Sequence, residues 1–355
     1  MGIFEQNHNG LHVPKTEWIV KDAIPKGGTT LWLGRSGTGK SLLTEYLGEC
    51  SKRGVDFLGF KTEKGDVLIV DEDTPTDSFK RNLNKINTAL SKINPNPPNN
   101  LYFASMKGLR ILDGSLLNAV KEEIKEHPEI NLVIFDCLHK ILGGEINTND
   151  TTEMSKYARF KNKLKELFPN LTVIVVHHIS DKKPYTFAEL MDERTYDLSM
   201  GSSVITQDAD NIIIQDVKTR NKGDLKELGL RVIPKRFRIN LGAIIIECVQ
   251  NEKELSFNFS RFYDPQADLE IVQNIIKLFE IEGRKHKKIR MSVNDVYQKF
   301  KDLYGIIKIR ETMMMMRNKG ILVLCKQKPN IFLFELKSKR KPKENKIVFQ
   351  KDDQK

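Results

Sequence analysis

Short apolar runs alternate with longer mixed segments over the first 260 residues, which predicts strands and helices in turn. Most of these runs are unbroken, as is typical of strands that a parallel sheet buries on both faces. Strands are expected at residues 29–33, 67–70, 101–104, 132–135, 173–176, 211–215, 230–234 and 243–249. Helices are expected at residues 41–53, 76–90, 116–126 and 152–167. The pattern therefore predicts an α/β fold with a mostly parallel sheet.

A different pattern follows residues 257–268, where we expect a domain boundary. An apolar stripe at helical spacing predicts a first helix after the boundary, with members Leu269, Val272, Ile275, Ile276 and Phe279. Ser292, with Asp295 three residues later, predicts a capping box that opens a second helix. A third helix is expected at 308–318 and two strands at 321–325 and 331–336. This order is typical of a winged helix–turn–helix.

Composition supports a soluble protein of two domains, because the chain has 355 residues of which 39% are hydrophobic. The four cysteines are Cys50, Cys137, Cys248 and Cys325. Their wide separation excludes a disulfide framework or a zinc knuckle and favours reduced thiols. The apolar runs are too short to cross a bilayer, and the first residues show no secretory signal. We therefore expect a cytoplasmic protein with no membrane partner.

The positive charge is concentrated at one end of the chain. Residues 281–355 hold 21 basic and 8 acidic residues, whereas the remaining residues hold 37 basic and 39 acidic ones. A near-neutral body with a basic end suggests a polyanion partner for that end. For residues 337–355, a solvated lysine-rich tail is the alternative.

The most specific motif is GRSGTGKS at residues 34–41, which lies between a predicted strand and a predicted helix. It matches the phosphate-binding loop G-x-x-x-x-G-K-[ST], whose backbone N–H groups cradle phosphates while the following helix adds its positive end. Lys40 would reach the β- and γ-phosphates of ATP, and Ser41 would bind Mg²⁺. The residues expected to bind the nucleotide are Gly34, Ser36, Gly37, Thr38, Gly39, Lys40 and Ser41.

Polar residues end three of the predicted strands. Asp136 follows the strand at 132–135 and suits the aspartate that orients a magnesium-bound water. An acidic trio at residues 71–73 can supply the carboxylate that polarises the attacking water in hydrolysis. Spacing does not choose among the three, and Asp73 is also placed to cap the next helix. His178, which follows His177 at the end of the strand at 173–176, can contact a γ-phosphate. A buried structural histidine is the alternative. The two histidines are not expected to bind one metal ion together, because neighbouring residues on a strand face opposite ways.

Five blocks of sequence in this order resemble the RecA-like P-loop ATPases, in particular the branch of plasmid-type hexameric replicative helicases and related mobile-element ATPases. The blocks are TEWIVKDAIPKGGTTLWLGRSGTGKS, GDVLIVDEDTP, LVIFDCL, VIVVHHISDK and MGSSVITQDADNIII, and the likeness covers about residues 14–250. The resemblance implies that Glu72 is the catalytic carboxylate and His178 the γ-phosphate sensor. It also implies that Arg236 or Arg238 completes the site of a neighbouring subunit in a ring, and that this ring is a hexamer.

In this family the loop after the strand that ends at Asp136 and the loop after the strand that ends at His178 hold single-stranded DNA in a central channel. These loops are residues 139–152 and 179–200. By resemblance, Lys182 and Lys183 would contact the phosphates of that strand. In the C-terminal region, Arg310, Arg317 and Lys319 belong to or follow the expected third helix, and Lys326 and Lys328 to the hairpin turn. A recognition helix with a basic wing is a usual way to bind duplex DNA. A protein-interaction module is the alternative.

We therefore expect residues 1–262 to form a RecA-like ATPase domain, residues 263–336 a winged-helix DNA-binding domain and residues 337–355 a basic tail. The expected function is an ATP- and Mg²⁺-dependent motor on DNA, such as a replicative helicase of a plasmid, phage or integrated element. Two alternatives remain. One is an ATP-switched DNA-binding regulator, and the other is an ATPase that acts on a protein partner, as circadian and recombination-mediator relatives do.

Overall fold

The computed structural model divides into two units, Met1–Tyr263 and Asp264–Lys355, each described here by itself. The structure describes residues 16–143, 151–179, 185–192, 206, 209–221, 224–236, 241–285, 291–318, 322–328 and 331–336. Among these residues, none of the helices has the length and apolar composition that crossing a membrane requires.

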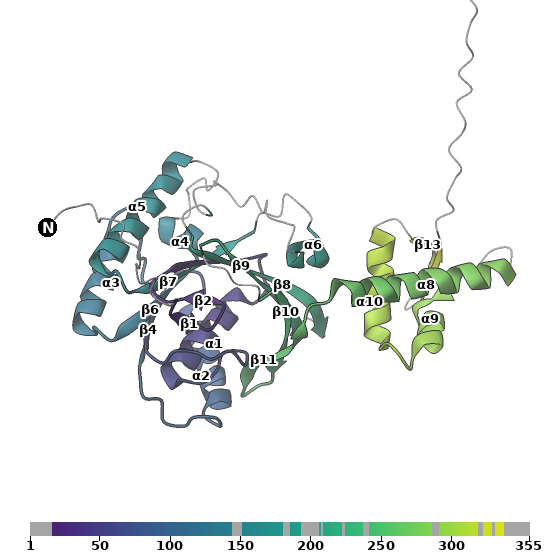
Figure 1. Ribbon diagram of the computed structural model, residues 1–355, viewed down its shortest axis with the longest axis horizontal. Coiled ribbons are helices and arrows are strands. Elements are labelled where there is room, and N and C mark those ends of the chain that lie inside the picture. Colours follow the sequence, from purple (N-terminus) through teal and green to yellow (C-terminus); the bar gives the residue numbers. More distant parts are fainter. Residues whose placement is uncertain are drawn as a thin grey trace, which may run out of the picture. The chain divides into compact units, whose positions relative to one another are not determined.

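The first unit is built on a nine-stranded sheet with the order β11-β10-β9-β8-β3-β7-β6-β4-β5 (Figure 1). Its strands are β3 (Thr29–Gly34), β4 (Asp66–Asp71), β5 (Leu101–Ser105), β6 (Ile130–Asp136), β7 (Thr172–His178), β8 (Asn211–Asn221), β9 (Asp224–Pro234), β10 (Ala243–Gln250) and β11 (Leu255–Phe262). The pairs from β8 through β3 to β5 are parallel, and those from β8 to β11 are antiparallel. A separate small sheet pairs β1 (Trp18–Val20) with β2 (Ile24–Pro25). The mostly parallel α/β sheet is thus confirmed.

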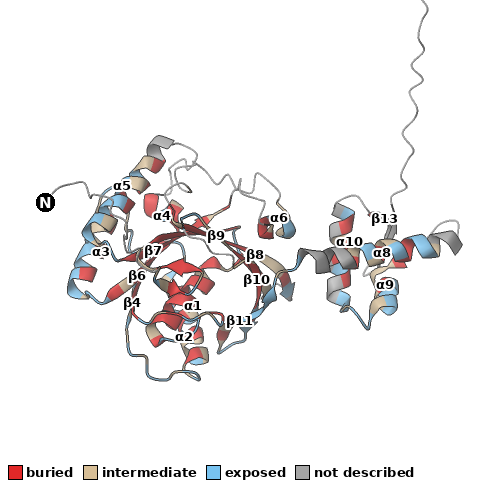
Figure 2. Cartoon of the chain, viewed as in Figure 1, coloured by how far each residue is buried: buried red, intermediate tan, exposed pale blue. Residues whose placement is uncertain are grey.

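Helices cover both faces of this sheet. They are α1 (Lys40–Arg53), α2 (Thr76–Leu90), α3 (Ser115–Glu126), α4 (Leu138–Leu142), α5 (Thr151–Leu167) and α6 (Phe187–Met191). The helices α1 and α2 share one hydrophobic core with Trp32, whereas α3, α4, α5 and α6 share the other with Leu31 and Leu33. Successive residues of β3 therefore face opposite cores, which explains why its sequence is an unbroken apolar run. Figure 2 shows the resulting buried centre.

Residues 257–262 belong to a strand that the sequence analysis did not predict, because they lie in the segment where the pattern of the first 260 residues breaks. They form most of β11, which pairs antiparallel with β10 at the edge of the sheet. Leu255 and Phe257 are buried, and the residues after them are exposed. The alternation typical of an edge strand therefore lasts for only a few residues, too few to separate a strand from a linker by pattern alone.

In its described residues, the second unit has three helices and a three-stranded sheet of order β12-β14-β13. Its elements are α8 (Pro265–Lys285), β12 (Met291–Ser292), α9 (Val293–Phe300), α10 (Ile306–Asn318), β13 (Leu322–Lys328) and β14 (Ile331–Leu336). The core joins residues of all three helices, including Ile275, Val296 and Met313. The predicted capping box is confirmed, because Ser292 Oγ accepts from Asp295 N and Asp295 Oδ2 accepts from Ser292 N. Met313 and Met316 are core residues.

Candidate nucleotide-binding site

The phosphate loop joins the carboxyl end of β3 to the first turn of α1. Gly37 and Gly39 have φ angles of +69° and +80°, a region that glycine adopts without a steric penalty. A Cβ atom on Gly39 would also overlap Leu225 Cδ1, from the start of β9. The glycines of the motif therefore allow both the turn of the loop and the close approach of the β8–β9 hairpin.

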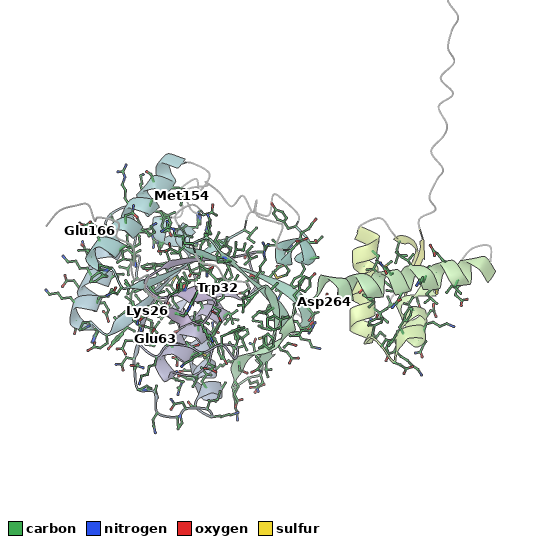
Figure 3. All side chains as sticks on the ribbon, in the orientation of Figure 1. Lys26, Trp32, Glu63, Met154, Glu166 and Asp264 are labelled. Carbon is green, nitrogen blue, oxygen red and sulfur yellow. The ribbon has the colours of Figure 1, made fainter. Side chains whose placement is uncertain are left out.

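The carbonyl groups of the loop are bonded to the protein around it. Trp32 Nε1, at the centre of the sheet (Figure 3), donates to Gln215 Oε1 at 2.8 Å, and Gln215 Nε2 donates to Thr38 O at 2.7 Å. Arg220 Nη2 donates to Gly37 O at 2.6 Å. These bonds hold the carbonyls on the protein side and so orient the loop N–H groups for an anion. Sequence reasoning missed Gln215, Arg220 and Leu225, because they lie more than 170 positions after the motif.

Lys40 lies buried within the loop. Its Nζ donates to Gly34 O at 3.0 Å and to Arg35 O at 2.9 Å, and lies 3.2 Å from His178 Nδ1. Burial lowers the pKa of this ammonium, and the charge of Asp136 opposes the shift. A phosphate group beside Nζ would favour the charged form further, because opposite charges at short range stabilise each other. The lysine is thus placed to bind an anion.

Asp136, at the end of β6, lies beside Ser41 and Lys40. Burial, and then the charge of Asp71, raises the pKa of its carboxyl to about 7, whereas a hydrogen bond from Ser41 and the charge of Lys40 oppose the rise. Within the described part of the chain, its buried Oδ2 has no hydrogen-bond partner. A buried oxygen of this kind is costly, and an oxygen-preferring divalent cation is a natural partner for it. Ser41 and Asp136 therefore fit Mg²⁺.

Two more carboxyl groups lie close to Asp136. Asp71 is its partner residue on β4, and Glu45 is one helical turn after Ser41 on α1. Burial is the main cause that raises the pKa of both groups, and the charges of Asp71 and Asp136 raise that of Glu45 further. Glu45 was missed in the sequence; its one signal is an acidic residue at i+4 from Ser41. Burial thus favours the protonated, uncharged form of both carboxyl groups.

The structure separates the three acids of residues 71–73. Asp71 Oδ1 accepts from Asp73 N at 2.8 Å and from Thr74 N at 2.7 Å, so it stabilises the turn after β4. Glu72 is buried and bonded to the loop at 107–110. Asp73 Oδ2 lies 3.9 Å from His178 Nε2, across the carboxyl edge of the sheet. Asp73, rather than Glu72, therefore lies beside the histidine at the end of β7.

The two histidines that end β7 have different environments. His177 is buried, and burial, followed by the charges of His178, His139 and Lys40, lowers its pKa to about 3. His178 is partly exposed and lies between Lys40 and Asp73. Ligand-type atoms of Asp73, Cys137 and His178 all lie within 4.8 Å of one another. The structure thus places His178 at the phosphate loop and His177 in the core.

Arg236 lies at the amino end of the parallel strands, whereas the phosphate loop lies at their carboxyl end. Its Nη1 contacts Asp210 Oδ1 at 2.8 Å, and Asp210 Oδ2 accepts from Thr29 N at the amino end of β3. The phosphate loop is at the other end of this strand, roughly 17 Å away at about 3.3 Å per residue. Arg236 therefore cannot reach the nucleotide bound by its own chain.

The other expected DNA and finger residues divide into two groups. Arg310 and Arg317 are exposed on α10. Lys326 and Lys328 belong to β13, and not to the hairpin turn that the sequence predicted, because the strand extends to Lys328. Their side chains lie outside the described residues, as do Lys182, Lys183, Arg238 and Lys319. The structure therefore places only the first pair.

Comparison with known families agrees with this geometry. Residues 7–183, just under half of the chain, match the family described as an AAA domain. This range contains the phosphate loop, the acids at 71–73, Asp136 and both histidines. No curated protein matches the chain. The sheet, the phosphate loop and the family match together support a P-loop ATPase domain in the first unit.

Proposed function

We propose that the protein is an ATP-dependent motor on DNA, a ring-forming replicative helicase or helicase-like replication protein. The observation that carries the ATPase part is the buried Lys40 at a phosphate loop, beside Asp136, whose Oδ2 has no hydrogen-bond partner among the residues that the structure describes. A phosphate loop of this kind binds a nucleoside triphosphate with Mg²⁺, and the match to an AAA domain supports ATP. The helicase part rests on the resemblance of the five sequence blocks.

The residues of the site have distinct parts in hydrolysis. Backbone N–H groups of residues 34–41 and the Lys40 ammonium bind the phosphates and orient the γ-phosphate. Ser41 and Asp136 would hold Mg²⁺, which neutralises charge on the phosphate oxygens. His178 contacts the γ-phosphate beside Lys40. An acid of the 71–73 trio activates the attacking water.

A second subunit completes the site in this proposal. Arg236 lies at the edge of the sheet opposite its own phosphate loop, where it can face the nucleotide of a neighbour in a ring. Arg238 is the alternative for this role. An arginine supplied by a neighbour stabilises the charge of the transferred phosphoryl group. Assembly into a ring, with six subunits by resemblance, is thus coupled to hydrolysis.

Two DNA contacts are proposed. Single-stranded DNA passes the loop after β7, where Lys182 and Lys183 contact its phosphates. Duplex DNA binds the second unit, a winged helix in this proposal, through Arg310 and Arg317 on α10, Lys319 after it, and Lys326 and Lys328 on the hairpin. The exposed arginines and the basic excess of residues 281–355 support this part.

The test is ATP turnover with and without single-stranded DNA, with Lys40→Ala as the inactive reference. A motor on single-stranded DNA shows strong stimulation that the variant lacks. Slow turnover that single-stranded DNA does not change, together with binding to one duplex sequence, contradicts the motor and favours the regulator. Turnover without any salt-dependent DNA binding favours an ATPase that acts on a protein partner.

A further inference from the structure

We propose that Asp73, and not Glu72, is the carboxylate that accepts the proton of the attacking water, and that Glu72 instead positions the loop at 107–110. This inference rests on the ATPase activity proposed above. It reverses the assignment that the sequence resemblance favours, and it follows from how the structure uses the two side chains.

Glu72 is fully engaged in a structural role. Its Oε1 accepts from Lys107 N at 3.1 Å and Leu109 N at 3.0 Å, and its Oε2 accepts from Gly108 N at 2.9 Å. Arg110 Nη1 adds a contact of 3.3 Å to Oε2. The side chain is only 2% exposed. Both carboxylate oxygens are therefore occupied by donors of the 107–110 loop, which holds this side chain away from a water at the phosphate loop.

Asp73 is oriented toward the phosphate loop. Its Oδ2 lies 3.9 Å from His178 Nε2, and its Oδ1 lies 3.9 Å from Lys140 Nζ on α4. The charge of Asp73 also acts on Lys40, Asp136 and Cys137. The side chain is 35% exposed, so water reaches it. The two acids differ because consecutive positions after β4 point in different directions.

His178 connects Asp73 to the reacting phosphate. Its Nδ1 is 3.2 Å from Lys40 Nζ, the group that binds the γ-phosphate in the proposed function. A water between Asp73 and this phosphate is thus within reach of the carboxylate, whereas Glu72 is held among the N–H groups of another loop. The order Lys40, His178, Asp73 is a line of side chains from the phosphate to the proton acceptor.

The chemical step is hydrolysis of the terminal phosphoanhydride. The water oxygen forms a bond to the γ-phosphorus while the bond from that phosphorus to the β,γ-bridging oxygen breaks. The water proton passes to an oxygen of the Asp73 carboxylate, and the bond electrons leave with ADP. The Asp73 carboxyl then returns the proton to solvent or to the released phosphate.

The experiment compares Asp73→Asn with Glu72→Gln in the full chain. Three quantities are measured for each: single-turnover ATP hydrolysis with Mg²⁺, affinity for a fluorescent ATP analogue, and hydrogen exchange of the amides at 107–109. We expect Asp73→Asn to slow hydrolysis 10²- to 10⁴-fold, the usual contribution of a general base, with nucleotide affinity changed less than about threefold. We expect Glu72→Gln to speed exchange at 107–109 and to slow hydrolysis by less than about tenfold.

The outcomes separate this inference from the proposed function. Asp73→Asn that hydrolyses ATP at the rate of the unsubstituted chain overturns the inference alone. So does Glu72→Gln that abolishes hydrolysis while exchange at 107–109 stays unchanged. An unsubstituted chain with no more turnover than Lys40→Ala overturns the ATPase proposal, and this inference with it.

Discussion

At the residue scale, the buried His177 should make the free energy of unfolding depend on pH. Burial lowers its folded-state pKa to about 3, below the ordinary value of 6.5. Between these two values the unfolded chain binds a proton at this histidine that the folded chain does not, so stability rises with pH and is complete above about 6.5. The slope is at most about 1.4 kcal/mol per pH unit.

His177→Gln should remove this part of the acid sensitivity, measured as the free energy of unfolding in urea at several pH values from 4 to 8. His127→Gln is the matched control, because it changes a partly exposed histidine on the surface of the same unit. An equal flattening of the pH dependence in the control would contradict the assignment to His177.

Gly39 is needed both for its positive φ angle and for the close approach of Leu225. Gly39 and Gly59 have nearly equal φ angles of +80° and +79°, but an added Cβ meets Leu225 at Gly39 and open space at Gly59. Gly59→Ala should therefore cost about 1 kcal/mol for the backbone alone. Gly39→Ala should cost more and also weaken nucleotide binding. Thermal unfolding of both variants and a nucleotide titration test this, and equal losses would exclude a role for the Leu225 contact.

At the scale of elements, the cap of α9 is a separable source of stability. Ser292→Ala removes the hydroxyl that accepts from Asp295 N, and this should cost about 1 kcal/mol. Ser292→Asp keeps an N-cap acceptor and should retain most of the stability. Hydrogen exchange of the amides in the first turn of α9 measures the effect. Faster exchange in Ser292→Asp than in Ser292→Ala would contradict it.

The strands and helices of the first unit were the part of the fold that the pattern of apolar residues predicted best. The eight strands and four helices expected in the first unit all have counterparts, because a strand buried on both faces produces a local run of apolar residues. The short elements β1, β2, α4 and α6 and the edge strand β11 were not predicted. Their few buried positions do not produce a periodicity, and their place depends on the sheet they pack against.

At the scale of the whole molecule, the basic excess of the last 75 residues leads us to expect that they bind duplex DNA. Arg310 and Arg317 are seven positions apart on α10, close to two helical turns, and both are exposed. The double variant Arg310→Ala/Arg317→Ala should weaken duplex binding and make its salt dependence shallower by about 1.8 in log–log slope, if each side chain neutralises one phosphate.

Lys121→Ala/Lys125→Ala is the control for net charge, because it removes two exposed lysines from α3 in the first unit. Fluorescence anisotropy of a labelled duplex over a range of salt concentrations measures both variants. Equal slopes for the two would show that the arginines of α10 do not contact phosphate.

The sequence by itself determined the layered α/β sheet and the phosphate loop, because both are written in short segments: apolar runs of a few residues, and eight consecutive residues at 34–41. Only the tertiary structure decided which of the three acids at 71–73 meets His178, and that Gln215 and Arg220 support the loop. The physical reason is that these side chains come together across strands far apart in sequence. The direction in which each points depends on the register and twist of the folded sheet.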